Sequence, residues 1–323
     1  MLLVACKESE NKASSERINT DIIPAIEDLD VLISENPENP KLYFDRASVY
    51  IENEGYQEAI NDLNKAISID SLKPEYHHLL ADSYLDYFQS KKAIDALKRA
   101  LTIFPNRTAT ELKLSEFYLI VKQYEKSIQT AAEILSREPT NGEAYFMMGM
   151  NFRANEDTVK SIYNFQAAIE NDPELIDAWI ILGMLHEAQN DPKALQYYNG
   201  ALEVESNNIQ VLHAKAYFLQ NNGEISEAQK LYKKIIKLDR NYMDAPLNSG
   251  ILYLEQDSIN QAFEQFNILV ENVPQNPMGY YYRGICHEQL GRIEAAQEDY
   301  NNALRLNPNY EQAARALKRV EVE

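Results

Sequence analysis

Apolar and polar positions recur along this chain with a period of 34 residues. Each period opens with a large apolar or aromatic residue and a small residue, continues through a polar turn, and closes with an alanine-centred run. Apolar residues spaced three and four apart in both halves are typical of amphipathic helices. The pattern therefore predicts a helix–turn–helix repeat, with repeats starting at Pro40, Pro74, Thr108, Gly142, Ile176, Ile209, Met243 and Pro277.

Two positions in every repeat hold only Ala, Gly or Ser. Position 8 reads Ala47, Ala81, Ser115, Gly149, Gly183, Ala216, Gly250 and Gly284, and position 20 reads Ala59, Ala93, Ser127, Ser161, Ala194, Ala228, Ala262 and Ala296. Small residues there allow two antiparallel helices to approach closely, with a larger residue at position 24 beside them in all repeats except the third. Proline at position 32 of five repeats ends the second helix, because proline cannot continue it.

This pattern resembles the tetratricopeptide repeat (TPR), a 34-residue helix–turn–helix motif. The Trp-x2-Leu-Gly signature of that family stands at Trp179–Gly183, and the resemblance covers Pro40 to Tyr310. It implies an all-α fold, a right-handed α-solenoid of about eight repeats at 40–73, 74–107, 108–141, 142–175, 176–208, 209–242, 243–276 and 277–310. Residues 20–39 match a half repeat, and residues 311–323 a polar capping helix of the kind that solenoids need.

Composition and charge exclude several classes of function. The chain has 31 Lys and Arg against 50 Asp and Glu, a net charge of −19, which disfavours binding to nucleic acid. No apolar run approaches the ~18 residues of a membrane-spanning helix. The sequence lacks the His and Cys spacings of metal sites, a phosphate-binding loop and a nucleophile elbow. We therefore expect no catalytic residue, no metal and no cofactor, with His186 and His287 packed in the core and Cys286 a buried thiol.

The resemblance to the TPR family implies a ligand groove lined by positions 2, 5, 9, 12 and 13 of the first helices. Apolar and aromatic residues dominate these positions. Acidic residues flank them, namely Glu75, Asp82, Glu143, Asp177, Glu187 and Asp244. The apolar set, here called the stripe, is Phe44, Ile51, Leu85, Leu112, Leu119, Phe146, Met150, Ile180, Met184, Tyr217, Leu247, Ile251, Leu254, Tyr281 and Ile285. It predicts a surface for proteins or peptides with apolar anchors and basic flanks. The alternative is that these residues only pack neighbouring repeats together.

The front of the chain carries a separate signal. Leu3-Val4-Ala5-Cys6 resembles a lipobox, in which the cysteine of a bacterial lipoprotein, here Bacteroidota-like, receives its lipid. Residues 1–19 are then a lipobox remnant and a flexible tether. Four residues between Met1 and Cys6 are fewer than the ~7–15 apolar residues of a signal peptide, so this interpretation requires translation to start upstream.

The sequence thus favours a non-catalytic scaffold for protein–protein interaction, anchored by lipid on Cys6 in a bacterial envelope, with the outer membrane as its site and no other contact with the membrane. A cytosolic adaptor or regulator of the same fold is the alternative if Met1 is the true start. An enzyme subunit is a third hypothesis, which the absence of a catalytic constellation disfavours.

Overall fold

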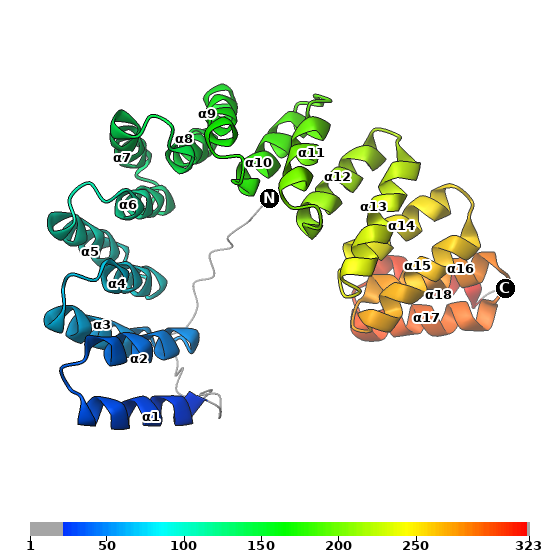
Figure 1. Cartoon of the computed structure of the whole chain (residues 1–323). Helices are drawn as coiled ribbons and strands as arrows, with labels where there is room; N and C mark the ends of the chain where they lie inside the picture. Colours follow the sequence, from blue (N-terminus) through cyan, green and yellow to red (C-terminus); the bar gives the residue numbers. More distant parts are fainter. Residues whose placement is uncertain (1–21, 322–323) are drawn as a thin grey trace. The chain divides into compact units, whose positions relative to one another are not determined.

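The computed structural model describes residues 22–321, and over that range all regular structure is helical (Figure 1). The all-α prediction is therefore confirmed. The helices are α1 (Ile22–Glu35), α2 (Pro40–Glu52), α3 (Tyr56–Ile69), α4 (Pro74–Asp86), α5 (Ser90–Ile103), α6 (Thr108–Ile120), α7 (Tyr124–Arg137), α8 (Gly142–Ala154), α9 (Thr158–Asn171), α10 (Ile176–Glu187), α11 (Ala194–Val204), α12 (Ile209–Asn221), α13 (Ile225–Leu238), α14 (Asp244–Glu255), α15 (Ile259–Asn272), α16 (Pro277–Gln289), α17 (Ile293–Leu306) and α18 (Glu311–Val320).

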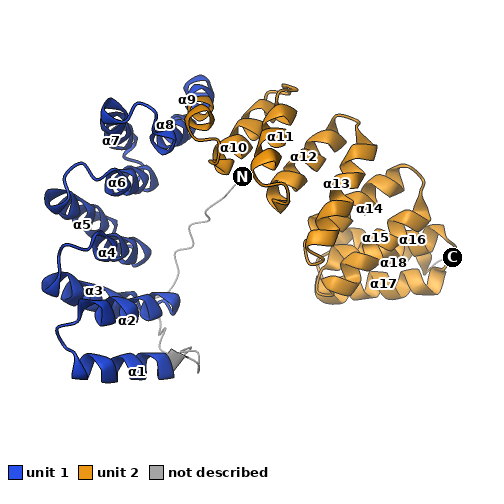
Figure 2. Ribbon diagram, in the orientation of Figure 1, with its two compact units in different colours: residues 1–164 blue, residues 165–323 orange. Residues whose placement is uncertain are grey.

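The chain divides into two compact units, residues 1–164 and 165–323, and the division falls within α9 (Figure 2). In unit 1, helices α1 to α8 each pack on the next one along the chain, and α6 also contacts α4 and α8. In unit 2, helices α10 to α18 pack in the same consecutive manner. Each unit is therefore a stack of helical hairpins in which the even-numbered helix opens a repeat and the odd-numbered helix closes it.

The turn inside each hairpin has one fixed backbone feature. Position 15 of every repeat adopts a positive φ, at Glu54, Phe88, Lys122, Glu156, Asn190, Gly223, Asp257 and Gly291. Glycine adopts this left-handed conformation freely, whereas other residues adopt it at a cost in free energy. Seven of these positions hold an exposed polar or charged residue or glycine. The eighth is Phe88, a bulky apolar residue with φ of 59° and a side chain that is 95% exposed.

The small residues of position 8 make room for the large residue of position 24. A Cβ atom added to Gly183 would lie 2.4 Å from Cε1 of Tyr198, and one added to Gly250 would lie 2.5 Å from Cε1 of Phe266. Both rings are fully buried. In the third repeat the pair at positions 8 and 20 is Ser115 and Ser127, and their hydroxyl groups bond across the two helices. Buried hydroxyls need such partners, so the hairpin stays closely packed.

Polar bonds hold several hairpins together as well. The hydroxyl of Tyr198 donates to Glu187 at 2.6 Å, and the hydroxyl of Tyr300 donates to Glu288 at 2.7 Å. In the first repeat, Arg46 donates to both carboxylate oxygens of Asp62, and in the eighth repeat Arg283 does the same with Asp299. Two-point contacts of this kind fix geometry as well as charge.

The last helix covers the end of unit 2 with a polar surface. Ala313, Ala316 and Val320 of α18 are buried against the preceding hairpin, while Arg315 and Lys318 on its other side are exposed. A terminal helix that is apolar on one side only shields the core from water, as an array of repeats requires. At the other end, α1 packs on α2 and carries the exposed side chains of Val31 and Leu32.

Candidate functional site

The stripe residues of unit 1 lie on the opening helix of each repeat and are half-buried. They are Phe44 and Ile51 on α2, Leu85 on α4, Leu112 and Leu119 on α6, and Phe146 and Met150 on α8. Phe44, Ile51 and Leu85 pack against the core of the first hairpins, and the Phe44 ring lies 5.0 Å from the ring of Tyr76. In unit 1 the stripe therefore joins neighbouring repeats and leaves part of each side chain open to solvent.

The stripe residues of unit 2 differ more widely in exposure. Met184 on α10 is 41% exposed and Tyr217 on α12 is 45% exposed. Half-buried side chains make up most of the remainder, namely Ile180 on α10, Ile251 and Leu254 on α14, and Tyr281 and Ile285 on α16. Met184 and Tyr217 are thus the members of the stripe with the largest exposed fraction of apolar side chain.

Leu247 departs from the expectation for the stripe. Its side chain on α14 is only 8% exposed, because it packs in a cluster with Phe266, Leu269 and Cys286. Its neighbours in this cluster cover nearly the whole side chain, so Leu247 adds little to the exposed surface of the stripe. Leu247 is therefore a packing residue of unit 2 in this structure.

Carboxylates accompany the stripe in both units. Glu75 and Glu143 in unit 1, and Asp177 and Asp244 in unit 2, are exposed and form no ion pair within residues 22–321. Asp82, in contrast, forms an ion pair with Lys113 at 2.7 Å, and burial raises the pKa of Asp82. Glu187 accepts the hydroxyl bond of Tyr198 described above. Four of the six predicted acidic residues thus keep a charge that a basic partner could pair.

A shallow hollow lies at the start of the stripe in unit 1. It has a volume of about 410 Å³ and is lined by Pro40, Lys41, Phe44, Lys73, Glu75 and Tyr76. The Phe44 and Tyr76 rings, which are tilted by 34° to each other, supply its apolar wall. Its lining carries charged groups of both signs, Lys41 and Lys73 against Glu75.

Sequence reasoning missed an aromatic cluster around His213 beside Tyr217. The His213 ring lies 6.5 Å from the Tyr217 ring and 5.6 Å from the Tyr242 ring, and its Nε2 atom lies 3.3 Å from the Asn248 side-chain nitrogen. Burial lowers the pKa of His213, so the imidazole is neutral at pH 7. His213 at position 5 of its repeat and Tyr217 at position 9 are visible in the sequence. The contact of the His213 ring with Tyr242, which precedes α14, depends on packing.

Three other side chains with potentially reactive groups, Cys286, His186 and His287, serve in packing. Cys286 is buried, and burial raises the pKa of its thiol to about 12. His186 is buried too, with Nδ1 at 2.8 Å from a carboxylate oxygen of Asp191 and its ring stacked on Tyr197. His287 is half-buried, and burial lowers its pKa. The expected packing of His186 and Cys286 is confirmed.

Residues 22–321 contain no cluster of three or more His, Cys, Asp or Glu side chains placed to hold a metal ion. Over the same range, none of the helices combines the length and hydropathy needed to cross a membrane. Cys6 lies outside the described residues, so the structure carries no information on the lipobox.

Comparison with known proteins identifies four of the repeats. Sequence profiles described as tetratricopeptide repeat match residues 40–71, 74–107, 209–242 and 277–310. Among curated proteins, the chain is 28% identical over 102 residues to a probable UDP-N-acetylglucosamine–peptide N-acetylglucosaminyltransferase SPINDLY of Solanum lycopersicum, covering 32% of this chain and 11% of that protein. It is 26% identical over 124 residues to the photosystem I assembly protein Ycf3 of Synechococcus, covering 33% of this chain and 72% of that protein.

Two solved structures align with most of this chain. The human IFIT1 dimer with PPP-AAAA aligns with a TM-score of 0.50 at 19% identity, over 88% of this chain and 69% of that chain. A tetratricopeptide repeat protein from Parabacteroides merdae aligns with a TM-score of 0.47 at 17% identity, over 77% of this chain and 98% of that chain. The chain spans only about a tenth of the length of the SPINDLY relative. Residues 40–71, 74–107, 209–242 and 277–310 are thus tetratricopeptide repeats, and the chain folds as an all-α solenoid built on them.

Proposed function

We propose that this chain is a protein-interaction scaffold, and that its stripe binds protein segments with apolar anchors and basic flanks. Tetratricopeptide repeats act as scaffolds for protein partners, which supports the first part of the proposal. The second part rests on the composition of the stripe and of the carboxylates beside it.

The observation that carries the proposal is the pairing of exposed apolar side chains with unpaired carboxylates in unit 2. Met184 and Tyr217 stand on two consecutive opening helices and expose 41% and 45% of their surface. Asp177 lies in the first turn of α10 and Asp244 is the first residue of α14, and both are exposed. Methionine and tyrosine suit adaptable contact surfaces, because methionine is flexible and tyrosine combines an apolar ring with a polar end.

Selection from a random peptide library displayed on phage tests this proposal with the full chain as the target. We expect enriched peptides to combine Leu, Phe or Met with nearby Lys or Arg. Binding of a selected peptide should fall by about tenfold or more in the double variant Met184→Glu/Tyr217→Glu, which places charge where an apolar anchor docks. The matched control is Val204→Glu/Leu238→Glu, because these side chains are similarly exposed, at 41% and 42%, on closing helices of the same unit.

The proposal fails if the selected peptides bind equally well to the Met184→Glu/Tyr217→Glu variant and to the control. If the enriched peptides are acidic, the proposed preference for basic flanks is refuted. Circular dichroism of each variant provides the check on folding, and we expect no loss of helix content because all four side chains are exposed.

For location, we propose that Cys6 carries a lipid and tethers the scaffold to a bacterial envelope. Support comes from the sequence Leu3-Val4-Ala5-Cys6 and from the polar residues that follow it. Two or more acyl chains bind a membrane stably, at ~0.8 kcal/mol per buried CH2 group. Expression of the gene with its own upstream DNA in the presence of a fatty-acid probe, beside Cys6→Ala, tests this. Unlabelled protein in the soluble fraction would favour the cytosolic adaptor instead.

A further inference from the structure

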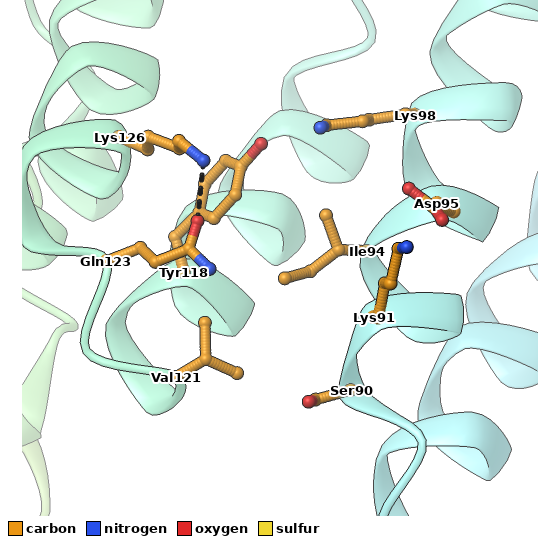
Figure 3. Close-up of a pocket in the computed structure, with 9 residues that line it drawn as sticks. All are labelled: Ser90, Lys91, Ile94, Asp95, Lys98, Tyr118, Val121, Gln123 and Lys126. Atoms are coloured by element: carbon orange, nitrogen blue, oxygen red, sulfur yellow. Dashed lines mark hydrogen bonds between the residues drawn. The ribbon is translucent and has the colours of Figure 1, made fainter.

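A basic hollow lies in unit 1 among side chains that are not part of the stripe. It is lined by Ser90, Lys91, Ile94, Asp95 and Lys98 from α5, Tyr118 and Val121 at the end of α6, and Gln123 and Lys126 at the start of α7 (Figure 3). Its volume is about 390 Å³. None of the stripe residues lines it, so it is a separate surface.

The charge of this segment is opposite to that of the chain. Residues 90–126 contain eight Lys and Arg against four Asp and Glu, whereas the remaining residues contain twice as many acidic as basic side chains. Asp95 is the one carboxylate among the lining residues, against three lysines. The hollow is positive, whereas the chain as a whole has a net charge of −19. Neither solubility nor folding requires this local change in the sign of the charge.

Two of the three lysines of the hollow lie close to one aromatic ring. The Nζ atoms of Lys98 and Lys126 lie 5.8 Å and 5.6 Å from the centre of the Tyr118 ring, and Lys126 also donates to Gln123 at 2.7 Å. In Figure 3 the hydroxyl end of Tyr118 points toward Lys98. Neither Lys91 nor Lys98 forms an ion pair with a carboxylate in the described part of the chain. Asp95 lies between them on α5 and offsets one of the three positive charges of the lining, which leaves an excess of positive charge for an anionic group.

The floor of the hollow is apolar. Ile94 and Tyr118 are 7% and 6% exposed, and Val121 is half-buried beside them. Two large apolar side chains border this lining along the chain: Phe88, which precedes Ser90 by two residues, is 95% exposed, and Ile120, which precedes Val121, is 51% exposed. Exposed large apolar side chains that lie close together are common at interaction sites.

We propose that this hollow binds an acidic protein segment that carries one large apolar side chain between its carboxylates. The apolar side chain packs on Ile94, Tyr118 and Val121, and the flanking carboxylates pair with Lys91, Lys98 and Lys126. A hollow of this size holds one side chain. A short acidic segment carries few negative charges, so the net negative charge of the protein repels it only weakly. A nucleic acid or an anionic membrane would bring many charges into that field and gain nothing from the apolar floor.

Calorimetric titration of the full chain with the synthetic peptide EEFEE, capped at both ends, tests the proposal at about 50 mM NaCl, where ion pairs are weakly screened. We expect EEFEE to bind, and the anchorless EEGEE to bind at least about tenfold more weakly. The variant Lys98→Glu/Lys126→Glu should weaken EEFEE by about tenfold or more, and Lys98→Gln/Lys126→Gln by less. Both lysines are exposed, so neither change disturbs the core.

The matched control is Lys233→Glu/Lys237→Glu on α13, which makes the same change of charge at two exposed lysines of unit 2. We expect it to leave binding of EEFEE unchanged. The proposal is overturned if the wild-type chain does not bind EEFEE, if EEGEE binds equally well, or if the control loses as much affinity as Lys98→Glu/Lys126→Glu. Tighter binding of a single-stranded DNA oligonucleotide or of phosphatidylserine vesicles, lost in the same variant, would overturn the choice of a peptide.

Discussion

Replacement of Gly250 by alanine should destabilise unit 2, because the closing helix α15 approaches α14 too closely for a side chain there. The new Cβ atom would lie 2.5 Å and 2.6 Å from Cε1 and Cζ of Phe266. The Phe266 ring is fully buried and stacks on Tyr282 with ring centres 5.2 Å apart, so it has no space to swing aside. The methyl group therefore has to push the two helices apart.

The expected magnitude follows from two opposing terms. Inserting a methyl group into a well-packed core costs about 1–3 kcal/mol. Alanine in place of glycine within a helix gains about 1 kcal/mol. We therefore expect Gly250→Ala to lower the free energy of unfolding by about 1 kcal/mol, although alanine is the better helix former.

A second substitution should reverse the effect. The first and second repeats hold the pairs Ala47 with Leu63 and Ala81 with Leu97 at the same two positions. The double variant Gly250→Ala/Phe266→Leu installs this pair in the seventh repeat. Phe266→Leu alone leaves a cavity and costs about 1–2 kcal/mol, but together with Gly250→Ala the added methyl fills part of that space.

Urea unfolding of the four proteins in the cycle measures this coupling, with circular dichroism for helix content and fluorescence of Trp179 for unit 2. We expect a favourable coupling free energy of about 1 kcal/mol. The reasoning is refuted if Gly250→Ala is as stable as the wild type, or if the two changes add within about 0.5 kcal/mol. In either case the small residue of position 8 would not be required by the ring at position 24.

Three further predictions concern single positions. Phe88→Asn should raise the urea midpoint by an amount equivalent to about 1 kcal/mol, because Asn tolerates a positive φ and the exposed Phe88 ring loses no packing; an unchanged midpoint would contradict this. Tyr300→Phe should lower the melting temperature through loss of the bond to Glu288, about 1 kcal/mol, whereas equal melting temperatures would show that the bond contributes nothing to stability. His213 has a lowered pKa in the folded state, so the unfolded state binds more protons and the free energy of unfolding falls as the pH drops below about 6.5. The slope of the free energy of unfolding against pH should therefore be smaller in His213→Gln than in the wild type. Identical slopes would exclude this role.

Much of the local structure could be predicted from the sequence, because it depends on neighbours at fixed spacing. Small residues at positions 8 and 20 specify close helix pairs, and proline at position 32 specifies where a closing helix ends. The structure places the opening helices at the predicted starts, apart from α14, which begins at Asp244 rather than Met243. The packing of Cys286 and His186 followed from the same periodicity, since both occupy positions that face another helix.

Exposure along the stripe was decided by the tertiary structure. Leu247 and Met184 occupy groove positions of their repeats, yet one is 8% exposed and the other 41%. The difference arises from what packs around each of them, and no pattern within one repeat contains that information.

The basic hollow shows the same limit. Lys98 on α5 and Lys126 on α7 are 28 residues apart in the sequence, yet each lies close to the ring of Tyr118 on a third helix, α6. By itself the sequence determined the repeat, its helices and the small residues that pair them, because these are local and periodic. Only the tertiary structure decided which apolar side chains remain exposed and where lysines gather, because both depend on side chains that packing brings together from different helices.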